Sequence, residues 1–156
     1  GIMELSGYNQ KECYFIPASG TSSIPMIVNI LIGWGLEYIV LTFANESETF
    51  VHKKLRKELF ENNVDLASKQ LLHMREFMDV EDMFSTIDFK KHIIHVREGI
   101  TVSNSEYLKD NNHSRAVLAS NFLQEIKQKK IQFKDFDEET RDNLNTFINQ
   151  LTVLLK

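Results

Sequence analysis

The chain has 156 residues, of which 42% are hydrophobic and 26% are charged, and this composition is typical of a globular domain that buries a core. Eighteen basic and twenty-two acidic residues give a formal net charge of −4, which excludes a uniformly basic nucleic-acid-binding coat. The single cysteine, Cys13, excludes an intramolecular disulfide framework and a cysteine-based zinc site. We therefore expect a soluble, cytoplasmic protein with a single domain, of a length that is ordinary for an α/β fold.

The first predicted elements are a strand over residues 13–16 and a helix over residues 24–32. The run CYFI is aromatic and β-branched and is stopped by a Pro-Ala-Ser-Gly turn, which is typical of a buried strand. The helix has Pro25 in its first turn and ends at Gly33. It is apolar nearly all round, so we expect it to be buried between other elements. The whole apolar stretch from Ile24 to Gly35 is about a dozen residues long, which is too short to span a bilayer. We therefore expect no membrane partner.

Residues 38–43 (YIVLTF) form the strongest predicted strand, because a continuous apolar run is typical of a parallel strand covered on both faces. An amphipathic helix is predicted over residues 45–61, with apolar residues at four-residue spacing from Val51 to Leu59. Residues 70–74 (QLLHM) are a third candidate strand. Strands that alternate with helices and short connections predict a small, mainly parallel sheet flanked by helices, which is an α/β fold.

The second half of the chain is predicted to be mainly helical. Helical periodicity is found over residues 84–94, around Phe122 and again after Asp137, and these segments form a helical C-terminal extension. We expect a single domain with a poorly structured start (1–12), an α/β part (13–80) and a mainly helical part (81–156).

Asn45, Glu46 and Glu48 directly follow the strongest predicted strand. Ligands of open α/β sheets bind outside the carboxyl ends of the strands, and carboxylate oxygens are good ligands for a divalent cation. The same residues also fit a capping box at the start of the next helix, where acids complement the helix dipole. The sequence favours capping over metal binding here, since helix starts often have this pattern.

Two further charged groups have similar alternatives. Glu81 and Asp82 follow the third predicted strand and are either a second cation position or a solvated helix start. Lys53, Lys54 and Lys57 are either contacts to nucleic-acid phosphates or one solvated face of a helix, and their spacing between apolar residues favours the solvated face.

The order of these motifs resembles the Toprim-like segment of OLD-family (overcoming lysogenization defect) ATP-dependent endonucleases. The resemblance is carried by the runs YFIPASGTSSIPMIVNILIGWGLEYIVL, VEDMFSTIDFKKHII, RAVLASNFLQEIK and DFDEETRDNLNTFINQL, and Gly-Trp-Gly-Leu at 33–36 is its most specific piece. It covers most of the chain, roughly residues 13–151. It implies a Toprim-like fold within a larger protein, with an ATPase region of the same full-length protein and DNA as partners.

The chemistry that this resemblance implies is phosphodiester cleavage with Mg²⁺ or Mn²⁺, which activates water and stabilises the leaving oxygen. The family's Asp-x-Asp positions fall on Phe43 and Asn45 in this sequence, and the glycine that often follows falls on Glu48. Phenylalanine cannot ligate a cation, and asparagine supplies only a neutral oxygen. The sequence therefore departs from the family where the metal-binding acids are needed.

The resemblance matches Glu81 or Asp82 to an acidic position that holds a second metal, and it leaves Arg115 as the only cation near the position of a catalytic lysine. We expect a catalytically degenerate module with a structural or interaction role. One alternative is a metal-dependent endonuclease whose acids have moved, and another is a DNA-binding module without catalysis. The first would use Glu46, Glu48, Glu81 and Asp82, and the second would use the two basic runs at residues 53–57 and 127–134.

Overall fold

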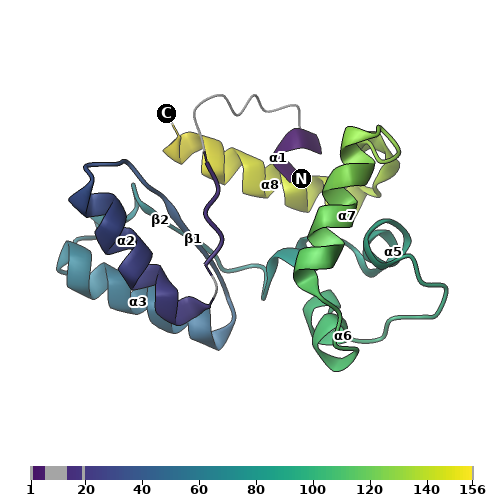
Figure 1. Cartoon of the computed structure of the whole chain (residues 1–156), viewed down its shortest axis with the longest axis horizontal. Helices are drawn as coiled ribbons and strands as arrows, with labels where there is room; N and C mark the ends of the chain where they lie inside the picture. Colours follow the sequence, from purple (N-terminus) through teal and green to yellow (C-terminus); the bar gives the residue numbers. More distant parts are fainter. Residues whose placement is uncertain (1, 6–13, 19, 156) are drawn as a thin grey trace. The chain divides into compact units, whose positions relative to one another are not determined.

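The computed structural model describes residues 2–5, 14–18 and 20–155 (Figure 1). The chain divides into two compact units. Residues 13–78 and 150–156 form one, which we call the α/β unit, and residues 1–12 and 79–149 form the other, the helical unit. Cys13 lies outside the described residues. No helix in the described ranges combines the length and the apolar character needed to cross a membrane.

A parallel pair of strands forms the sheet of the α/β unit. Strand β1 (Val40–Phe43) pairs with β2 (Leu71–Met74), so that Val40 is opposite Leu71 and Phe43 is opposite Met74. The connection between them contains α3 (Glu46–Phe60) and α4 (Val64–Ala67). The parallel order predicted for these two strands is confirmed, as is the helix between them, and the mixed α/β class follows from them.

The core of the α/β unit lies where α2 (Ile24–Gly33), α3 and the two strands meet. Val51 and Leu55 face this core from α3 because they are one helical turn apart, and both are buried. They pack with Val28 of α2 and with Val40 and Leu71 of the strands. This packing fixes the position of α3, and therefore of its first turn, at the end of β1.

The predicted strand over residues 13–16 is wrong for the residues that the structure describes. Residues 14–18 are neither strand nor helix, and the side chains of Tyr14, Phe15 and Ile16 are 90%, 54% and 57% exposed. An apolar run becomes a buried strand only when a neighbouring strand pairs with it, and in the described part of the chain the sheet contains only β1 and β2.

Helix α2 begins and ends where the sequence predicts, but the expected burial on all sides is wrong. Proline occupies its first turn, and Trp34 is its C-cap. Val28 is the buried residue of this helix, whereas Met26, Ile30 and Ile32 are each more than two-fifths exposed. A helix packed on one side only leaves the opposite face in solvent, whatever its composition.

The helical unit contains mostly short elements. They are α1 (Ile2–Leu5), η2 (Val80–Met83), α5 (Thr86–Asp88), the π-helix η3 (Phe89–Ile94), α6 (Asn104–Asp110), α7 (Arg115–Lys127), η4 (Phe133–Asp135) and residues 138–149 of α8 (Glu138–Leu154). The rings of Phe84, Phe122 and Phe136 pack together, with centroids 5.7 Å apart for Phe84 and Phe122. This geometry is the edge-to-face arrangement that aromatic pairs prefer.

A polar network ties the start of α8 to the start of α5. The Asp137 carboxylate accepts hydrogen bonds from the Ser85 hydroxyl and from the backbone N–H of Thr140. The Asp137 N–H donates to the carboxylate of Asp88 (2.8 Å), and the Ser85 N–H donates to the Thr140 hydroxyl (2.9 Å). The Ser85 hydroxyl also accepts the N–H of Asp88 (3.2 Å), so Asp137 and Ser85 satisfy first-turn N–H groups of α8 and α5 that otherwise lack partners.

Candidate functional site

The candidate site of the α/β unit lies at the carboxyl end of β1, where Asn45 caps α3. Its backbone is extended, and its side-chain oxygen accepts a hydrogen bond from the N–H of Glu48 (2.9 Å). This is the N-cap geometry that asparagine favours. The N-cap that the sequence predicts at Asn45 is confirmed.

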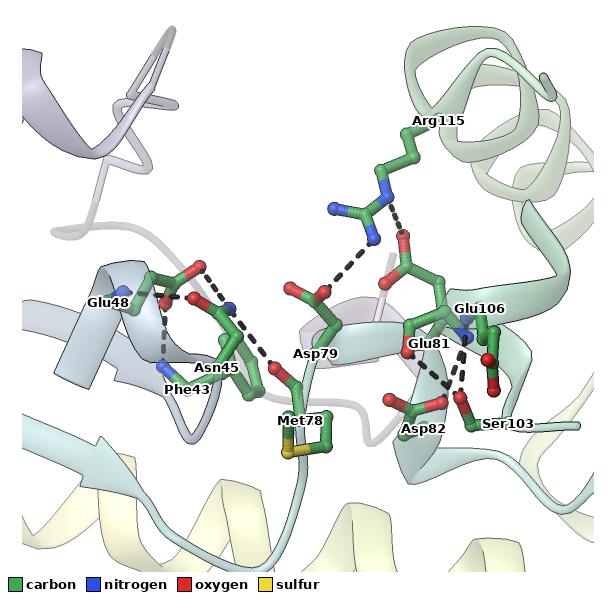
Figure 2. A network of polar contacts seen from close by, with 11 residues as sticks. Phe43, Asn45, Glu48, Met78, Asp79, Glu81, Asp82, Ser103, Glu106 and Arg115 are labelled. Atoms are coloured by element: carbon green, nitrogen blue, oxygen red, sulfur yellow. Dashed lines mark hydrogen bonds and ion pairs between the residues drawn. The ribbon is translucent and has the colours of Figure 1, made fainter. Parts of the chain in front are cut away.

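The carboxylate of Glu48 turns back toward the end of β1 (Figure 2). Its Oε2 accepts a hydrogen bond from the backbone N–H of Phe43 (2.6 Å), and its Oε1 accepts one from the side-chain amide of Asn45 (3.1 Å). The same amide donates to the carbonyl oxygen of Met78 (3.1 Å). Both oxygens of Glu48 therefore have neutral donors from its own unit, while Glu46 is exposed to solvent.

A histidine pair lies beside the same strand. The rings of His52 and His73 stack with their centroids 4.6 Å apart, and the hydroxyl of Thr42 lies 3.0 Å from Nδ1 of His73 and 3.5 Å from Nδ1 of His52. Burial, together with the charges of His73 and the neighbouring arginines, lowers the pKa of His52 to about 4, and burial is the largest cause. Burial also lowers the pKa of His73, although the Glu48 carboxylate opposes this shift. No sequence motif singles out this pair.

The candidate site of the helical unit is an ion-paired cluster around Arg115. The guanidinium Nε lies 3.0 Å from Oε1 of Glu81, and Nη2 lies 3.0 Å from Oδ2 of Asp79 (Figure 2). Glu81 is only 9% exposed. Burial raises the pKa of the Glu81 carboxyl, and the charge of Arg115 limits that rise. Asp79 was not among the predicted site residues.

Asp82 and the backbone of Glu81 hold the start of α6. Oδ1 of Asp82 accepts a hydrogen bond from the N–H of Ser105 (3.0 Å), and the amide of Asn104 donates to the carbonyl oxygens of Glu81 (2.9 Å) and Phe84 (2.7 Å). The second oxygens of Glu81 and Asp82 are buried and have no hydrogen-bond partner among the described residues.

In neither unit do the described residues supply a ready set of ligands for a divalent cation. The predicted ligands fall into two units, with Asn45, Glu46 and Glu48 in one and Glu81 and Asp82 in the other. Within the described ranges there is no group of three or more histidine, cysteine or acidic side chains that could hold a metal ion. Mg²⁺ requires nearly octahedral oxygen ligands, and the two buried oxygens without partners fall short of that set.

The lysines predicted as nucleic-acid contacts are exposed on α3. Lys53, Lys54 and Lys57 all reach solvent, and Nζ of Lys54 lies 3.9 Å from the carboxylate of Glu58 one helical turn away. Such i, i+4 pairs are common on solvated helix faces and contribute little to stability. Their positions are therefore consistent with a solvated face of the helix.

The comparisons with known proteins identify no relative. A scan against models of protein families matches none of them, and searches of curated proteins and of solved structures also find no match.

Proposed function

We propose that this chain is a Toprim-like module of an OLD-type protein that has lost metal-dependent catalysis and has a structural or interaction role. The proposal rests on the sequence resemblance and on the chemistry at the end of β1. The parallel pair β1 and β2, joined through α3, supports it at the level of the α/β class.

The observation that carries the proposal is the pairing of the Glu48 carboxylate with the backbone N–H of Phe43. The resemblance places the first metal-binding aspartate at Phe43, and this side chain is apolar and 92% buried. The carboxylate that accepts the Phe43 N–H belongs to Glu48, and each of its oxygens accepts one hydrogen bond, from Phe43 or from Asn45. A cation at Glu48 would have to share oxygens that neutral donors already hold in place, and Phe43 and Asn45 would add no charged oxygen to its ligands.

The Arg115 cluster supports the same proposal in the helical unit. A guanidinium that contacts both Asp79 and Glu81 supplies positive charge where the resemblance places a second metal. A divalent cation brought to Glu81 would be repelled by Arg115, because like charges in a partly buried site interact strongly. The charge of Arg115 therefore opposes cation binding at this position.

A cleavage assay with supercoiled plasmid DNA tests the proposal. The chain is incubated with DNA in Mg²⁺ and in Mn²⁺, alongside the variants E48A and E81A, and E58A serves as a control because Glu58 is exposed and pairs with the exposed Lys54. We expect no nicking above the rate of DNA in buffer with metal. Metal-dependent nicking that E48A and E81A abolish and E58A retains would contradict the proposal and establish the endonuclease with relocated acids.

A further inference from the structure

The helical unit contains a cavity of about 680 Å³, and none of the candidate metal ligands lines it. It lies at α5, at the π-helix η3 and at the loop that follows, and its volume is within the range of small-molecule sites. Its lining combines apolar and basic side chains: Thr86, Ile87, Lys90, Lys91, His95, Val96, Arg97, Gly99 and Ile100.

The backbone of the cavity wall is unusual. Residues 89–94 form a single π-helical segment, and His95 ends it with a left-handed backbone (φ 54°). The N–H of Val96 donates to the carbonyl oxygen of Lys90 (3.2 Å), which closes this wide turn. Turns of π-helix and left-handed residues other than glycine are energetically unfavourable and occur often at functional sites.

The charge of the lining is entirely of one sign. Lys90, Lys91 and Arg97 contribute three positive charges, and the lining contains no aspartate or glutamate. None of the three forms an ion pair with another residue of the described ranges. Such a concentration of unpaired positive charge attracts anions, even on a chain whose net charge is −4.

The nearby acids are held by other partners. Asp88 is buried and accepts the N–H of Asp137, and Glu98 accepts a hydrogen bond from the hydroxyl of Tyr107 (2.9 Å). Glu125 lies 3.4 Å from Nε2 of His95 at the edge of the cavity. These carboxylates therefore leave the three cations available for an external anion.

The apolar part of the lining adds a second chemical requirement. Ile87 is 70% exposed, and Val96 and Ile100 are partly exposed beside it. Exposed aliphatic side chains next to three cations suit a ligand that carries both anionic groups and a flat or apolar part. A nucleotide has this combination, since its phosphates pair with lysine and arginine and its base has an apolar face.

We propose that this cavity binds a nucleotide, with its phosphates at Lys90, Lys91 and Arg97 and its base against the aliphatic side chains. Arginine can contact a phosphate through two parallel hydrogen bonds, and each lysine acts as a compact point charge. The same chemistry is offered by a free nucleoside triphosphate and by the nucleotides of a single strand, so the test includes both. The proposal does not depend on a Toprim-like function of the chain.

The test measures the binding of two probes, ATP without added metal and a short fluorescent oligothymidylate, to the whole chain. The variant K90Q/K91Q/R97Q removes three charges from the cavity, and K69Q/R75Q/K109Q removes two lysines and one arginine that are exposed outside it as the matched control. We expect the cavity variant to weaken binding by at least about tenfold and the control variant to weaken it by less than about twofold. If the strand binds, three phosphate contacts give a slope of log K against log salt near −2.

A steric variant separates binding in the cavity from general attraction of anions. A Cβ at Gly99 meets no atom within 4 Å, so G99L enlarges a residue of the cavity lining without changing the charge. We expect G99L to weaken binding of the preferred probe by about tenfold, with unchanged circular dichroism. Three results would overturn the proposal: no binding of either probe, equal losses in the cavity and control variants, or wild-type affinity in G99L.

Discussion

Glu48 of the α/β unit and Glu81 of the helical unit are both acids near a helix start, and the protein satisfies them in different ways. The Glu48 carboxylate is held by two neutral donors, the N–H of Phe43 and the amide of Asn45. The Glu81 carboxylate is held by the guanidinium of Arg115. A metal ion would therefore share the Glu48 carboxylate with two neutral donors, and at Glu81 it would be repelled by the charge of Arg115. Both glutamates have partners within the protein, but the partners are neutral at Glu48 and positively charged at Glu81.

The largest effect is expected at the ion-paired acid. Removing the guanidinium in R115A leaves the Glu81 carboxylate, which is 91% buried, without its cation. Because Arg115 itself is half exposed, we expect a loss of about 2 kcal/mol in the free energy of unfolding rather than the full cost of a broken buried pair. Urea denaturation measures this loss. The double variant R115A/E81Q should recover part of it, and an equal loss in both variants would show that charge pairing is unimportant.

A smaller loss is expected at the acid that neutral donors hold. E48A removes the acceptor of the Phe43 N–H, which we expect to cost about 1–2 kcal/mol in urea denaturation. E48Q keeps an oxygen that can accept this hydrogen bond, so it should lose less than half as much. High salt should reduce the effect of R115A but leave the effect of E48A nearly unchanged, since screening acts on charge pairs. Equal salt sensitivity of the two variants would remove the distinction between the sites.

The smallest effect is expected from the histidine pair beside Glu48. The fold lowers the pKa of His52 from 6.5 to about 4, so the folded state favours the neutral ring. The resulting stability is fully present above pH 6.5 and is lost as the pH falls toward about 4. H52Q should therefore flatten the decline in urea midpoint over this range. H113Q is the histidine control, and a decline in H52Q as steep as in the wild type would contradict this role.

The strands and the long helix of the α/β unit could be predicted because their signals are local. The apolar runs ending at Phe43 and Met74 and the four-residue spacing of α3 each lie within one segment, and the cap at Asn45 lies within four residues. The run at residues 14–16 has the same composition but lacks a pairing partner among the described residues, and composition does not reveal whether a partner exists.

The candidate sites depend on contacts that the sequence does not specify. The capping role of Asn45 was predictable, whereas the pairing of Arg115 with Asp79 joins residues 36 positions apart. The cavity beside η3 was also missed, because a π-helix has no simple periodic signal and its lysines look like an ordinary solvated run. The aromatic cluster of Phe84, Phe122 and Phe136 likewise brings three distant segments together.

The central claim is that Glu48 and Glu81, two of the acids predicted as metal ligands, are held by the protein's own groups and do not bind a divalent cation. It is tested most directly by titrating the chain with Mn²⁺ and following the free ion by electron paramagnetic resonance. The account predicts no binding in the micromolar range by the wild-type chain, and the same result for E48A and E81A. Micromolar binding of Mn²⁺ by the wild-type chain that E48A or E81A abolishes would contradict it.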